Sequence, residues 1–438
     1  MTVIENIVWL LVLIGVMIFV HELGHYWAAR FFDVRVDVFS FGFGPRLFGF
    51  KRGETDFRFS AVLFGGFVKM AGEQPTDADV NDPRAFLAKP RWQRLLIAFS
   101  GPAMNIVLAV ALVTGVFMVR YPKMPDSVEE GMVGYVTPGS PAAKAGIHEG
   151  DRIVTIEGIQ NPSWDDIAMR EASAGDHPLQ VRIRRNASEF WVVVTPALNP
   201  HTGAGSAGWQ AQGEVEIADV SQGMPAEKFG LRKGDVLLRG NGQPLRSLHR
   251  LQEIIERTGG KPVEIDYVRQ GQPNRVAVQP MFAKQDGPSR WMIGVFLQHH
   301  MIVVQLPLPE ALRESLQQNA KSATLIYQFL RGVIERRMSP KAISGPIGIA
   351  QLSGDAAREG PMVFIGLMAM VSLNLAIFNL LPIPILDGGV IVMLLIEMVM
   401  RRDLSLRFKE MVFKLGFVFL MAIMAFVIYN DISKILPG

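Results

Sequence analysis

Long apolar segments without charge dominate the hydrophobic pattern of this chain. Four of them approach the roughly 20 residues that a helix needs to cross a bilayer. The uncharged segments are residues 6–20, 95–119, 360–386 and 415–430. With their flanks, they predict transmembrane helices over residues 1–32, 95–120, 361–387 and 415–431. The pattern therefore predicts a polytopic α-helical membrane protein with four transmembrane helices.

Positive charge is concentrated in two links between these segments. Residues 30–94 carry eleven Lys and Arg, and residues 401–414 carry five. Because links rich in Lys and Arg stay in the cytoplasm, both are predicted to be cytoplasmic, with both termini and the long middle segment outside. The first 29 residues contain neither Lys nor Arg. The start of the chain is therefore not expected to be a cleavable signal peptide with a basic region.

The long middle segment contains an internal repeat. Residues 140–158 match residues 224–242 at a constant offset of 84, and Pro, Ala, Lys, Gly and Asp recur at equivalent positions. Each copy is followed by alternating β-strand patterns. The repeat resembles a tandem of bacterial, protease-associated PDZ domains, over residues 126–200 and 208–300. The alternative is a pair of β-rich structural modules that bind nothing, and whether either groove holds a peptide stays open.

Two further segments complete the predicted organisation. Residues 301–360 contain an amphipathic helix, with apolar residues at helical spacing between Pro309 and Met338, followed by a linker. Such a helix either packs its apolar face or lies on the membrane surface. Residues 388–414 are predicted to form an interfacial helix and a cytoplasmic link.

Composition narrows the possible chemistry. The 438 residues are 49% hydrophobic and 19% charged, and the net charge of +3 gives no indication of nucleic-acid binding. The chain contains no cysteine, which excludes disulfides and thiolate metal sites. A metal would therefore take His, Asp or Glu as ligands.

The first apolar segment ends in an HExxH motif, His21-Glu-Leu-Gly-His25. Residues four apart share a helix face, so both imidazoles can bind one ion while Glu22 is directed to a metal-bound water. Two histidines that pack only as polar groups are the alternative. At the end of a membrane segment such groups are costly unless they bind something. The motif therefore predicts a zinc site with Glu22 as the general base.

A catalytic zinc needs a third protein ligand. The candidate is Asp387, which follows the third apolar segment in Asn379-Leu-Leu-Pro-Ile-Pro-Ile-Leu-Asp387. An aspartate at a helix end in the headgroup region is the alternative. Against it, Pro382 and Pro384 break the helix, and irregular backbone at membrane depth is tolerated only inside protein or beside a cavity.

HExxH in the first membrane segment, Leu-Asp-Gly in the third and PDZ modules between them resemble the site-2 protease family of intramembrane zinc metalloproteases. Its bacterial branch, which cuts anti-sigma factors, is the nearest match. The resemblance implies zinc held by His21, His25 and Asp387, catalysis by Glu22, and the amide of Asn379 near the scissile bond. Many relatives have His after Leu-Asp-Gly-Gly, whereas Val390 stands here, and no role is assigned to it.

The resemblance also implies that residues 57–70, within a cytoplasmic membrane-associated β-hairpin region over residues 33–94, pair with the substrate. A transmembrane helix must unwind before its peptide bonds can be hydrolysed, and the freed backbone groups then need partners. An added strand on the enzyme supplies them. An ordinary cytoplasmic hairpin is the alternative. The predicted substrate-binding residues are Phe64, Gly65, Gly66, Asn379, Pro382 and Pro384.

The sequence thus predicts a zinc endopeptidase of the bacterial inner membrane that cuts single-span membrane proteins. The substrate implied by the resemblance is an anti-sigma factor already trimmed by an upstream protease, with the PDZ pair excluding uncut substrates. One alternative is a membrane-tethered PDZ receptor with an inert metal site. A second is an ion transporter, against which stands the lack of an inverted repeat.

Overall fold

The computed structural model describes residues 2–73, 77, 82–123, 131–199, 204–284, 289–334 and 345–435. The chain forms two units. The first comprises residues 1–121, 305–327 and 343–438, and the second comprises residues 122–304 and 328–342. The first unit contains the predicted membrane helices, and the second contains the predicted β-rich modules.

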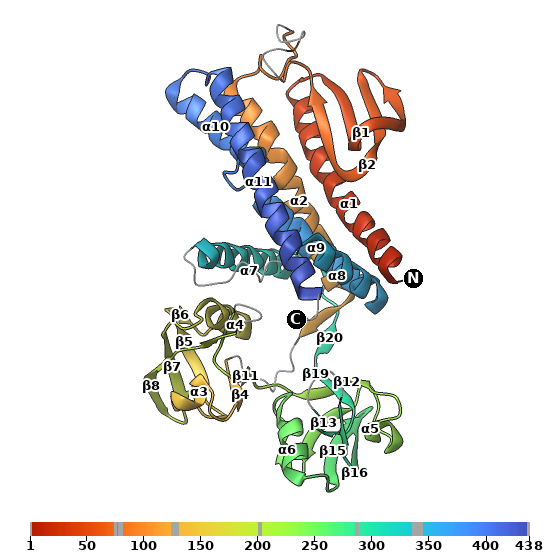
Figure 1. Ribbon diagram of the computed structural model, residues 1–438, viewed down its shortest axis with the longest axis vertical. Helices are drawn as coiled ribbons and strands as arrows, with labels where there is room; N and C mark the ends of the chain where they lie inside the picture. Colours follow the sequence, from red (N-terminus) through yellow and green to blue (C-terminus); the bar gives the residue numbers. More distant parts are fainter. Residues whose placement is uncertain are drawn as a thin grey trace. The chain divides into compact units, whose positions relative to one another are not determined.

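Four described helices of the first unit are long and apolar enough to cross a membrane, as the sequence predicts. They are α1 (Thr2–Phe31), α2 (Arg91–Val119), α9 (Pro361–Asn379) and α11 (Leu406–Ile435). α1 packs along α2, and α2 packs along α9 (Figure 1). α9 ends at Asn379 rather than continuing to residue 387, because the segment that follows contains two prolines, which lack the backbone N–H that a helix needs.

Glycines allow α1 and α2 to approach closely. A Cβ atom at Gly24 of α1 would overlap the backbone oxygen of Ser100 on α2. A Cβ atom at Gly101 of α2 would overlap the imidazole of His25 on α1. Small residues at helix interfaces permit such backbone approach in membranes, where apolar burial does not drive association. The HExxH segment therefore lies directly against α2.

Three further helices belong wholly or largely to the first unit. They are α7 (Leu308–Ile334), α8 (Pro346–Glu359) and α10 (Asp387–Met400). α7 occupies the predicted amphipathic segment, whose last residues lie outside the described part of the chain. Ser315 of α7 donates to the Val110 carbonyl of α2 at 2.8 Å. The carboxylate of Asp431 on α11 accepts backbone N–H groups at the start of α8 and so caps that helix.

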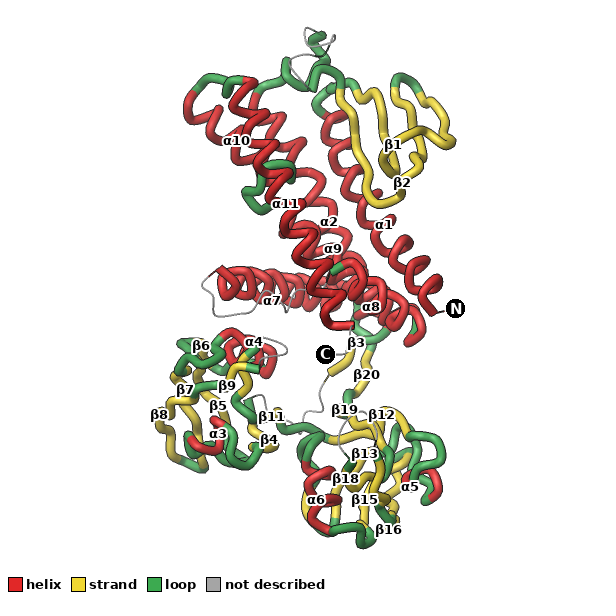
Figure 2. Tube along the Cα trace, in the orientation of Figure 1, coloured by secondary structure: helices red, strands yellow, loops and turns green. Residues whose placement is uncertain are grey.

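An antiparallel hairpin follows α1 and consists of β1 (Val36–Arg52) and β2 (Thr55–Met70) (Figure 2). Val36, Phe39 and Val68 are buried in a cluster against the helices. The outer half of the hairpin leaves apolar side chains exposed, namely Phe43, Leu47, Phe48 and Phe50. A hairpin thus occupies the predicted β-region, whereas its cytoplasmic position stays a prediction.

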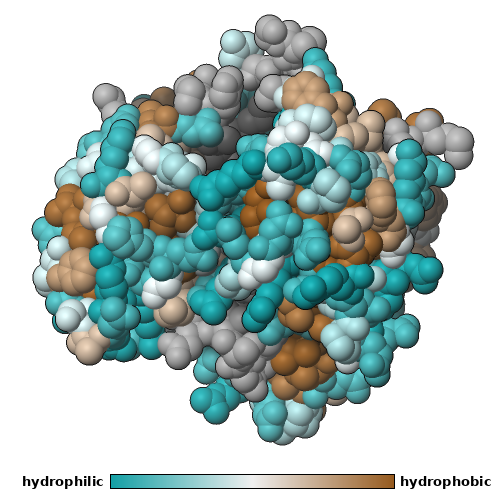
Figure 3. Space-filling model, turned by 90° about the horizontal axis from the view of Figure 1, so that it is seen from below, coloured by the Kyte–Doolittle hydropathy of each residue, from teal (hydrophilic) through white to brown (hydrophobic). Residues whose placement is uncertain are grey.

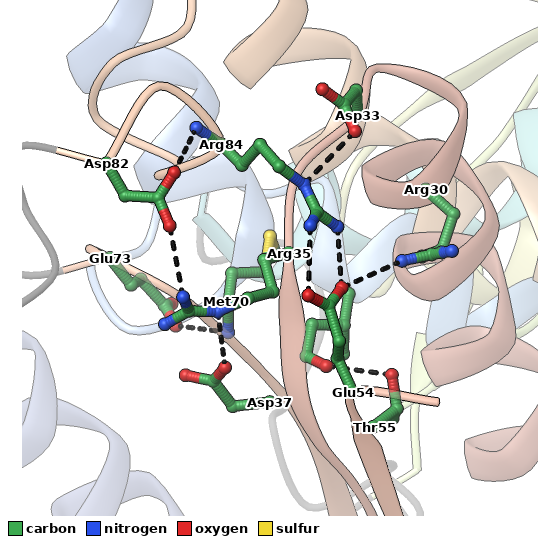
Figure 4. A network of polar contacts seen from close by, with 11 residues as sticks. Arg30, Asp33, Arg35, Asp37, Glu54, Thr55, Met70, Glu73, Asp82 and Arg84 are labelled. Atoms are coloured by element: carbon green, nitrogen blue, oxygen red, sulfur yellow. Dashed lines mark hydrogen bonds and ion pairs between the residues drawn. The ribbon is translucent and has the colours of Figure 1, made fainter. Parts of the chain in front are cut away.

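Ion pairs hold the base of this hairpin. Arg84 donates to both carboxylate oxygens of Glu54, at 3.0 and 2.7 Å, and Arg35 contacts Asp37 and Asp82, each at 3.0 Å (Figure 4). The hydrogen bonds from the Arg84 guanidinium lower the pKa of the Glu54 carboxyl. An exposed pair such as Arg84–Glu54 contributes little free energy, and the Arg84 and Arg35 contacts connect the hairpin to the segment that returns to α2.

The second unit contains two β-rich modules, named here module 1 (residues 131–211) and module 2 (residues 215–299). Module 1 contains β4 (Val133–Val136), α3 (Pro141–Lys144), β5 (Arg152–Ile156), β6 (Ile159–Gln160), α4 (Trp164–Ser173), β7 (Leu179–Arg185), β8 (Ser188–Val194), β9 (Ala197–Leu198), β10 (Gly205–Ser206) and β11 (Trp209–Ala211). Module 2 contains β12 (Val215–Val220), α5 (Pro225–Lys228), β13 (Val236–Gly240), β14 (Gln243–Pro244), α6 (Arg250–Thr258), β15 (Val263–Arg269), β16 (Gln272–Val278), β17 (Met281–Ala283), β18 (Arg290–Met292) and β19 (Val295–His299).

The last strand of each module pairs with its first strand. β11 pairs with β4, and β19 pairs with β12. Module 1 therefore extends to residue 211, past the predicted boundary at residue 200. Turn patterns mark the end of a strand but do not show which strand it pairs with, so the sequence pattern did not reveal this closure. Outside the modules, β3 (Tyr121–Lys123) pairs with β20 (Ile302–Val304).

Each module has its own apolar core. On the face of the molecule shown in Figure 3, polar residues dominate and the hydrophobic patches are separate from one another. The repeated Gly-Asp motif makes the same contacts in both copies. Asp151 accepts from Arg185 at 2.7 and 2.8 Å, and Asp235 accepts from Arg269 at 2.6 and 2.7 Å. The repeat in the sequence is thus a repeat in the structure.

Candidate metal centre

The HExxH motif lies near the end of α1, where one helical turn separates its two histidines. Both side chains are almost fully buried between α1 and α2. Nε2 of His21 and Nε2 of His25 lie 3.2 Å apart, so both rings direct the same nitrogen to one point. This arrangement follows from the i, i+4 spacing on one helix face.

Asp387 is brought to this point by the segment between α9 and α10. A Cβ atom at Gly388 would overlap the Leu381 carbonyl, and one at Gly389 would overlap the Ile383 carbonyl. The two glycines therefore let the segment fold tightly onto the start of α10. This tight fold turns the Asp387 carboxylate toward the histidines.

The three side chains form a triangle whose dimensions suit a metal ion. Asp387 Oδ2 lies 3.1 Å from His21 Nε2, and Asp387 Oδ1 lies 3.5 Å from His25 Nε2. Ligands about 2.0–2.1 Å from a tetrahedral zinc ion lie roughly 3.3 Å apart. The two Nε2 atoms are 3.2 Å apart, and the Asp387 oxygen that each of them contacts lies at 3.1 or 3.5 Å, which is close to that value. Two imidazole nitrogens and one carboxylate oxygen therefore fit zinc and leave a fourth position open.

The ring nitrogens that face away from this point also have neighbours, and both belong to α2. His25 Nδ1 lies 2.8 Å from the Ile97 carbonyl oxygen, and His21 Nδ1 lies 3.3 Å from the Asn105 amide. Partners of this kind set the orientation of metal-binding imidazoles. The space for both rings depends on Gly101, as described above.

Glu22 lies between this triangle and strand β2. A Cβ atom at Gly66 would meet the Glu22 side chain at 3.0 Å. The general base predicted from the motif is therefore next to the strand predicted to hold the substrate.

A cavity of ≈ 580 Å³ opens beside these residues. His21, Glu22, His25 and Asp387 line it, and so do the predicted substrate-binding residues Gly65, Gly66 and Asn379. Further lining residues come from helices and from the segment after β2, among them Ile18, Glu73, Phe86, Ile97, Leu375, Val390 and Phe413. The cavity therefore offers room beside the metal triangle for an extended peptide.

Three of the predicted substrate-binding residues are not among the described residues that line the cavity. The side chain of Phe64 lies outside the described part of the structure. Pro382 and Pro384 are not among the described residues that line the cavity. The backbone oxygen of Pro384 lies so close to Gly416 of α11 that a Cβ atom there would overlap it. The Pro384 backbone thus packs against α11, and both prolines belong to the segment that carries Asp387.

Four residues without a predicted role also contact the site or line its cavity, namely Val390, Ile97, Gly101 and Asn105. Val390, which stands where many relatives have His, lines the cavity. Gly101 and Asn105 belong to Gly101-Pro-Ala-Met-Asn105, which is unusual in an apolar helix since it includes Gly, Pro and Asn. A polar residue in a membrane helix indicates function, so the sequence alone could have pointed to Asn105.

Comparison with known families agrees with this geometry. The family model of Peptidase family M50 matches residues 9–423 of this chain. The chain belongs to peptidase family M50. This family is the site-2 protease family predicted from the motifs, so the chain is an intramembrane zinc metalloprotease.

Curated relatives of this M50 chain cover its full length. The "Regulator of sigma E protease" of Salmonella typhimurium LT2 is 28% identical, over 99% of this chain and 100% of the relative. The "Putative zinc metalloprotease" of Xylella fastidiosa 9a5c is 32% identical, over 98% of each chain. Among solved structures, the PDZ domain of a Listeria monocytogenes SdrC-like protein aligns with 21% of this chain and 97% of that domain, at 22% identity and a TM-score of 0.18.

Proposed function

We propose that this chain is an endopeptidase that binds zinc through His21, His25 and Asp387 and cuts the transmembrane segment of single-span membrane proteins. One observation carries the assignment. The Nε2 atoms of His21 and His25 lie 3.2 Å apart, each has an Asp387 carboxylate oxygen within 3.1–3.5 Å, and the group lies beside Glu22 and an open cavity. Zinc held there lowers the pKa of bound water to about 7 and polarises a carbonyl group. The arrangement therefore suits hydrolysis of a peptide bond.

The chain's own residues then divide the work. Glu22 takes the proton from the attacking water and passes it to the departing amine. The Asn379 side chain, which lines the same cavity, donates to a carbonyl near the scissile bond. In this role Asn379 holds the peptide while Glu22 moves the proton.

Strand β2 is proposed to bind the substrate as an added strand. Among the described residues, β1 is its only strand partner. Gly66 of β2 faces Glu22, so a peptide paired with β2 at this point would pass the general base. Backbone pairing recognises an unwound segment without selecting side chains. Pairing with β2 therefore does not by itself select the side chains of the segment.

The relatives named as regulators of sigma E support a signalling substrate. We propose an anti-sigma factor that an upstream protease has already trimmed, in an envelope stress response of the bacterial inner membrane. The two modules are assigned as PDZ domains on the outer side of that membrane, with both termini outside and the active site toward the cytoplasm.

The two modules differ at equivalent loops. Ala142 and Ala226 donate to the carbonyls of Ala207 and Ile293, at 2.9 and 2.8 Å, so these two loops correspond. In module 1 the Glu171 carboxylate accepts the Ala207 N–H at 2.5 Å. A carboxylate of the module itself thus occupies the loop of module 1.

In module 2 a groove of ≈ 410 Å³ lies between β19 and α6. Its apolar lining includes Leu248, Leu251, Ile255 and Phe296. Because a carboxylate of module 1 itself fills its loop, exclusion by bulk explains a tandem better than two recognition sites do. We therefore favour exclusion of untrimmed substrates over recruitment.

Glu22→Gln tests the assignment. The purified variant should retain about one zinc per chain yet cut a single-span model substrate at least roughly a thousandfold more slowly, since the amide cannot accept the water's proton. Asp387→Ala should lose zinc as well as activity. Full cleavage by Glu22→Gln, or full zinc in Asp387→Ala, would refute the proposed roles.

Topology has its own test, because the chain contains no cysteine. Cysteine placed at Ser188, in the turn region of module 1, should react with an impermeant reagent in intact spheroplasts. Cysteine at Lys51, in the hairpin, should react only after lysis. The reverse pattern would place the modules in the cytoplasm.

A further inference from the structure

The Asn105 side chain lies behind the imidazole of His21. It is fully buried on α2, and its Nδ2 lies 3.3 Å from His21 Nδ1. Its Oδ1 has no hydrogen-bond partner among the described residues. A buried polar atom without a partner is rare in folded proteins and calls for an explanation.

Metal binding decides which nitrogen of His21 carries the proton. Nε2 faces Asp387 Oδ2 at 3.1 Å and His25 Nε2 at 3.2 Å, so it is turned toward the proposed metal position. A neutral imidazole that binds a metal through Nε2 carries its proton on Nδ1, which is then a donor. The Asn105 amide nitrogen is also a donor. The two groups would repel each other in that state.

We propose that Asn105 is a positioning residue whose Oδ1 accepts the Nδ1–H of His21 when zinc is bound. Turning the amide by about 180° exchanges its oxygen and nitrogen with little change of shape. Oδ1 then has a partner, and His21 has an acceptor. His25 provides the parallel, because its Nδ1 already lies 2.8 Å from the Ile97 carbonyl oxygen. Helix α2 thus orients both imidazoles.

The role rests on the metal site proposed above and adds a residue to it. An acceptor on the outer nitrogen fixes the ring and increases the basicity of the nitrogen that binds the metal. Loss of such a partner typically weakens metal binding 10–100-fold. The Asn105 backbone has a separate contact, since its carbonyl oxygen accepts from Ser372 Oγ of α9 at 2.9 Å. The amide and the backbone can therefore be tested independently.

Zinc affinity of the detergent-purified full chain, measured by competition with a chelator, tests the proposal. Asn105→Leu keeps the approximate size but removes the acceptor, and it should bind zinc 10–100-fold more weakly. Asn105→Asp keeps an acceptor oxygen and should retain most of the affinity. Ser372→Ala, the packing control, should bind zinc like the parent. Thermal unfolding of the metal-free proteins verifies folding.

A second readout does not depend on the leucine variant. With Co²⁺ as the probe, Asn105→Asp should shift the visible absorption bands, because a charged acceptor makes the His21 ring more basic. Unchanged bands, or unchanged zinc affinity in Asn105→Leu, would overturn the proposal. Equal losses in the Leu, Asp and Ser372→Ala variants would assign the effect to packing and overturn it too. A parent protein that binds no zinc would instead refute the metal site itself.

Discussion

Gly101 of α2 lies so close to His25 of α1 that a Cβ atom on the glycine would overlap Nε2 of the histidine. That nitrogen is one of the three proposed zinc ligands. The absence of a side chain at residue 101 is therefore a condition for the metal site. A single methyl group at residue 101 should therefore empty the site.

Gly101→Ala should abolish stable zinc binding, because the added methyl group displaces the His25 ring. Gly115→Ala is the matched control: it changes the same residue type in the same helix, and a Cβ atom there meets nothing within 4 Å. Zinc content after purification and dialysis is the measurement. Normal zinc in Gly101→Ala would show that α2 can move away without affecting the ligands.

The segment that carries Asp387 should be equally intolerant of a methyl group. In Gly388→Ala the new Cβ would overlap the Leu380 and Leu381 carbonyl oxygens. We expect lost zinc and at least a tenfold loss of cleavage. Gly366→Ala on α9, where a Cβ atom meets nothing within 4 Å, is the control. Equal activity of the two variants would contradict the tight fold described for residues 380–388.

The Asp151–Arg185 contact should stabilise module 1. Asp151 is almost fully buried and accepts two hydrogen bonds from Arg185 and one from the His148 N–H. Asp151→Asn replaces one accepting oxygen with a donor, so the module should lose about 2–3 kcal/mol of unfolding free energy. Hydrogen exchange in the β7 and β8 peptides measures this loss.

Asp266→Asn in module 2 is the control for that experiment, because the partner of Asp266, Arg275, is largely exposed. Exposed pairs contribute roughly 0–1 kcal/mol. Asp235→Asn, the equivalent change to Asp151→Asn, should destabilise module 2 by a similar amount. Slow exchange in both buried-aspartate variants would show that the repeated motif has no stabilising role.

Module 1 should lose stability as the pH rises through the native pKa of Glu171. Burial raises the pKa of this carboxyl, so the native module binds its proton at a higher pH than the unfolded chain, whose value is about 4.3. The stabilisation that this proton gives to the native module is complete at pH values below the unfolded pKa, and it is lost at pH values above the native pKa. Glu171→Gln should remove this decrease of stability with rising pH. Glu157→Gln, which changes an exposed residue, should not remove it. Hydrogen exchange of α4 at several pH values compares them.

Removing both modules should relax the choice of substrate if they act by exclusion. β3 pairs with β20 on either side of them, so residues 126–300 can be replaced by a short Gly-Ser linker that closes this pair. Trimmed substrate should still be cut, and untrimmed substrate should become cleavable. The same deletion in Glu22→Gln is the control. Slower cleavage of both substrates would indicate recruitment instead.

The sequence alone was sufficient wherever a pattern is local or repeated. Uncharged apolar segments predicted four membrane helices, since only a helix satisfies its own backbone in lipid. His21, Glu22 and His25 share a helix face through spacing alone. The 84-residue repeat predicted two modules of like construction, and the buried Asp151 and Asp235 repeat the same contacts.

Tertiary structure decided what depends on residues distant in the chain. Asp387 was a candidate by motif and resemblance, but its 3.1 Å approach to His21 depends on how residues 380–386 fold. Gly101 and Asn105 joined the site only once α2 lay against α1. The Glu171 carboxylate filled its loop only when β11 closed module 1. Helical spacing is set by the backbone, whereas contacts between elements are set by packing, which one sequence does not display.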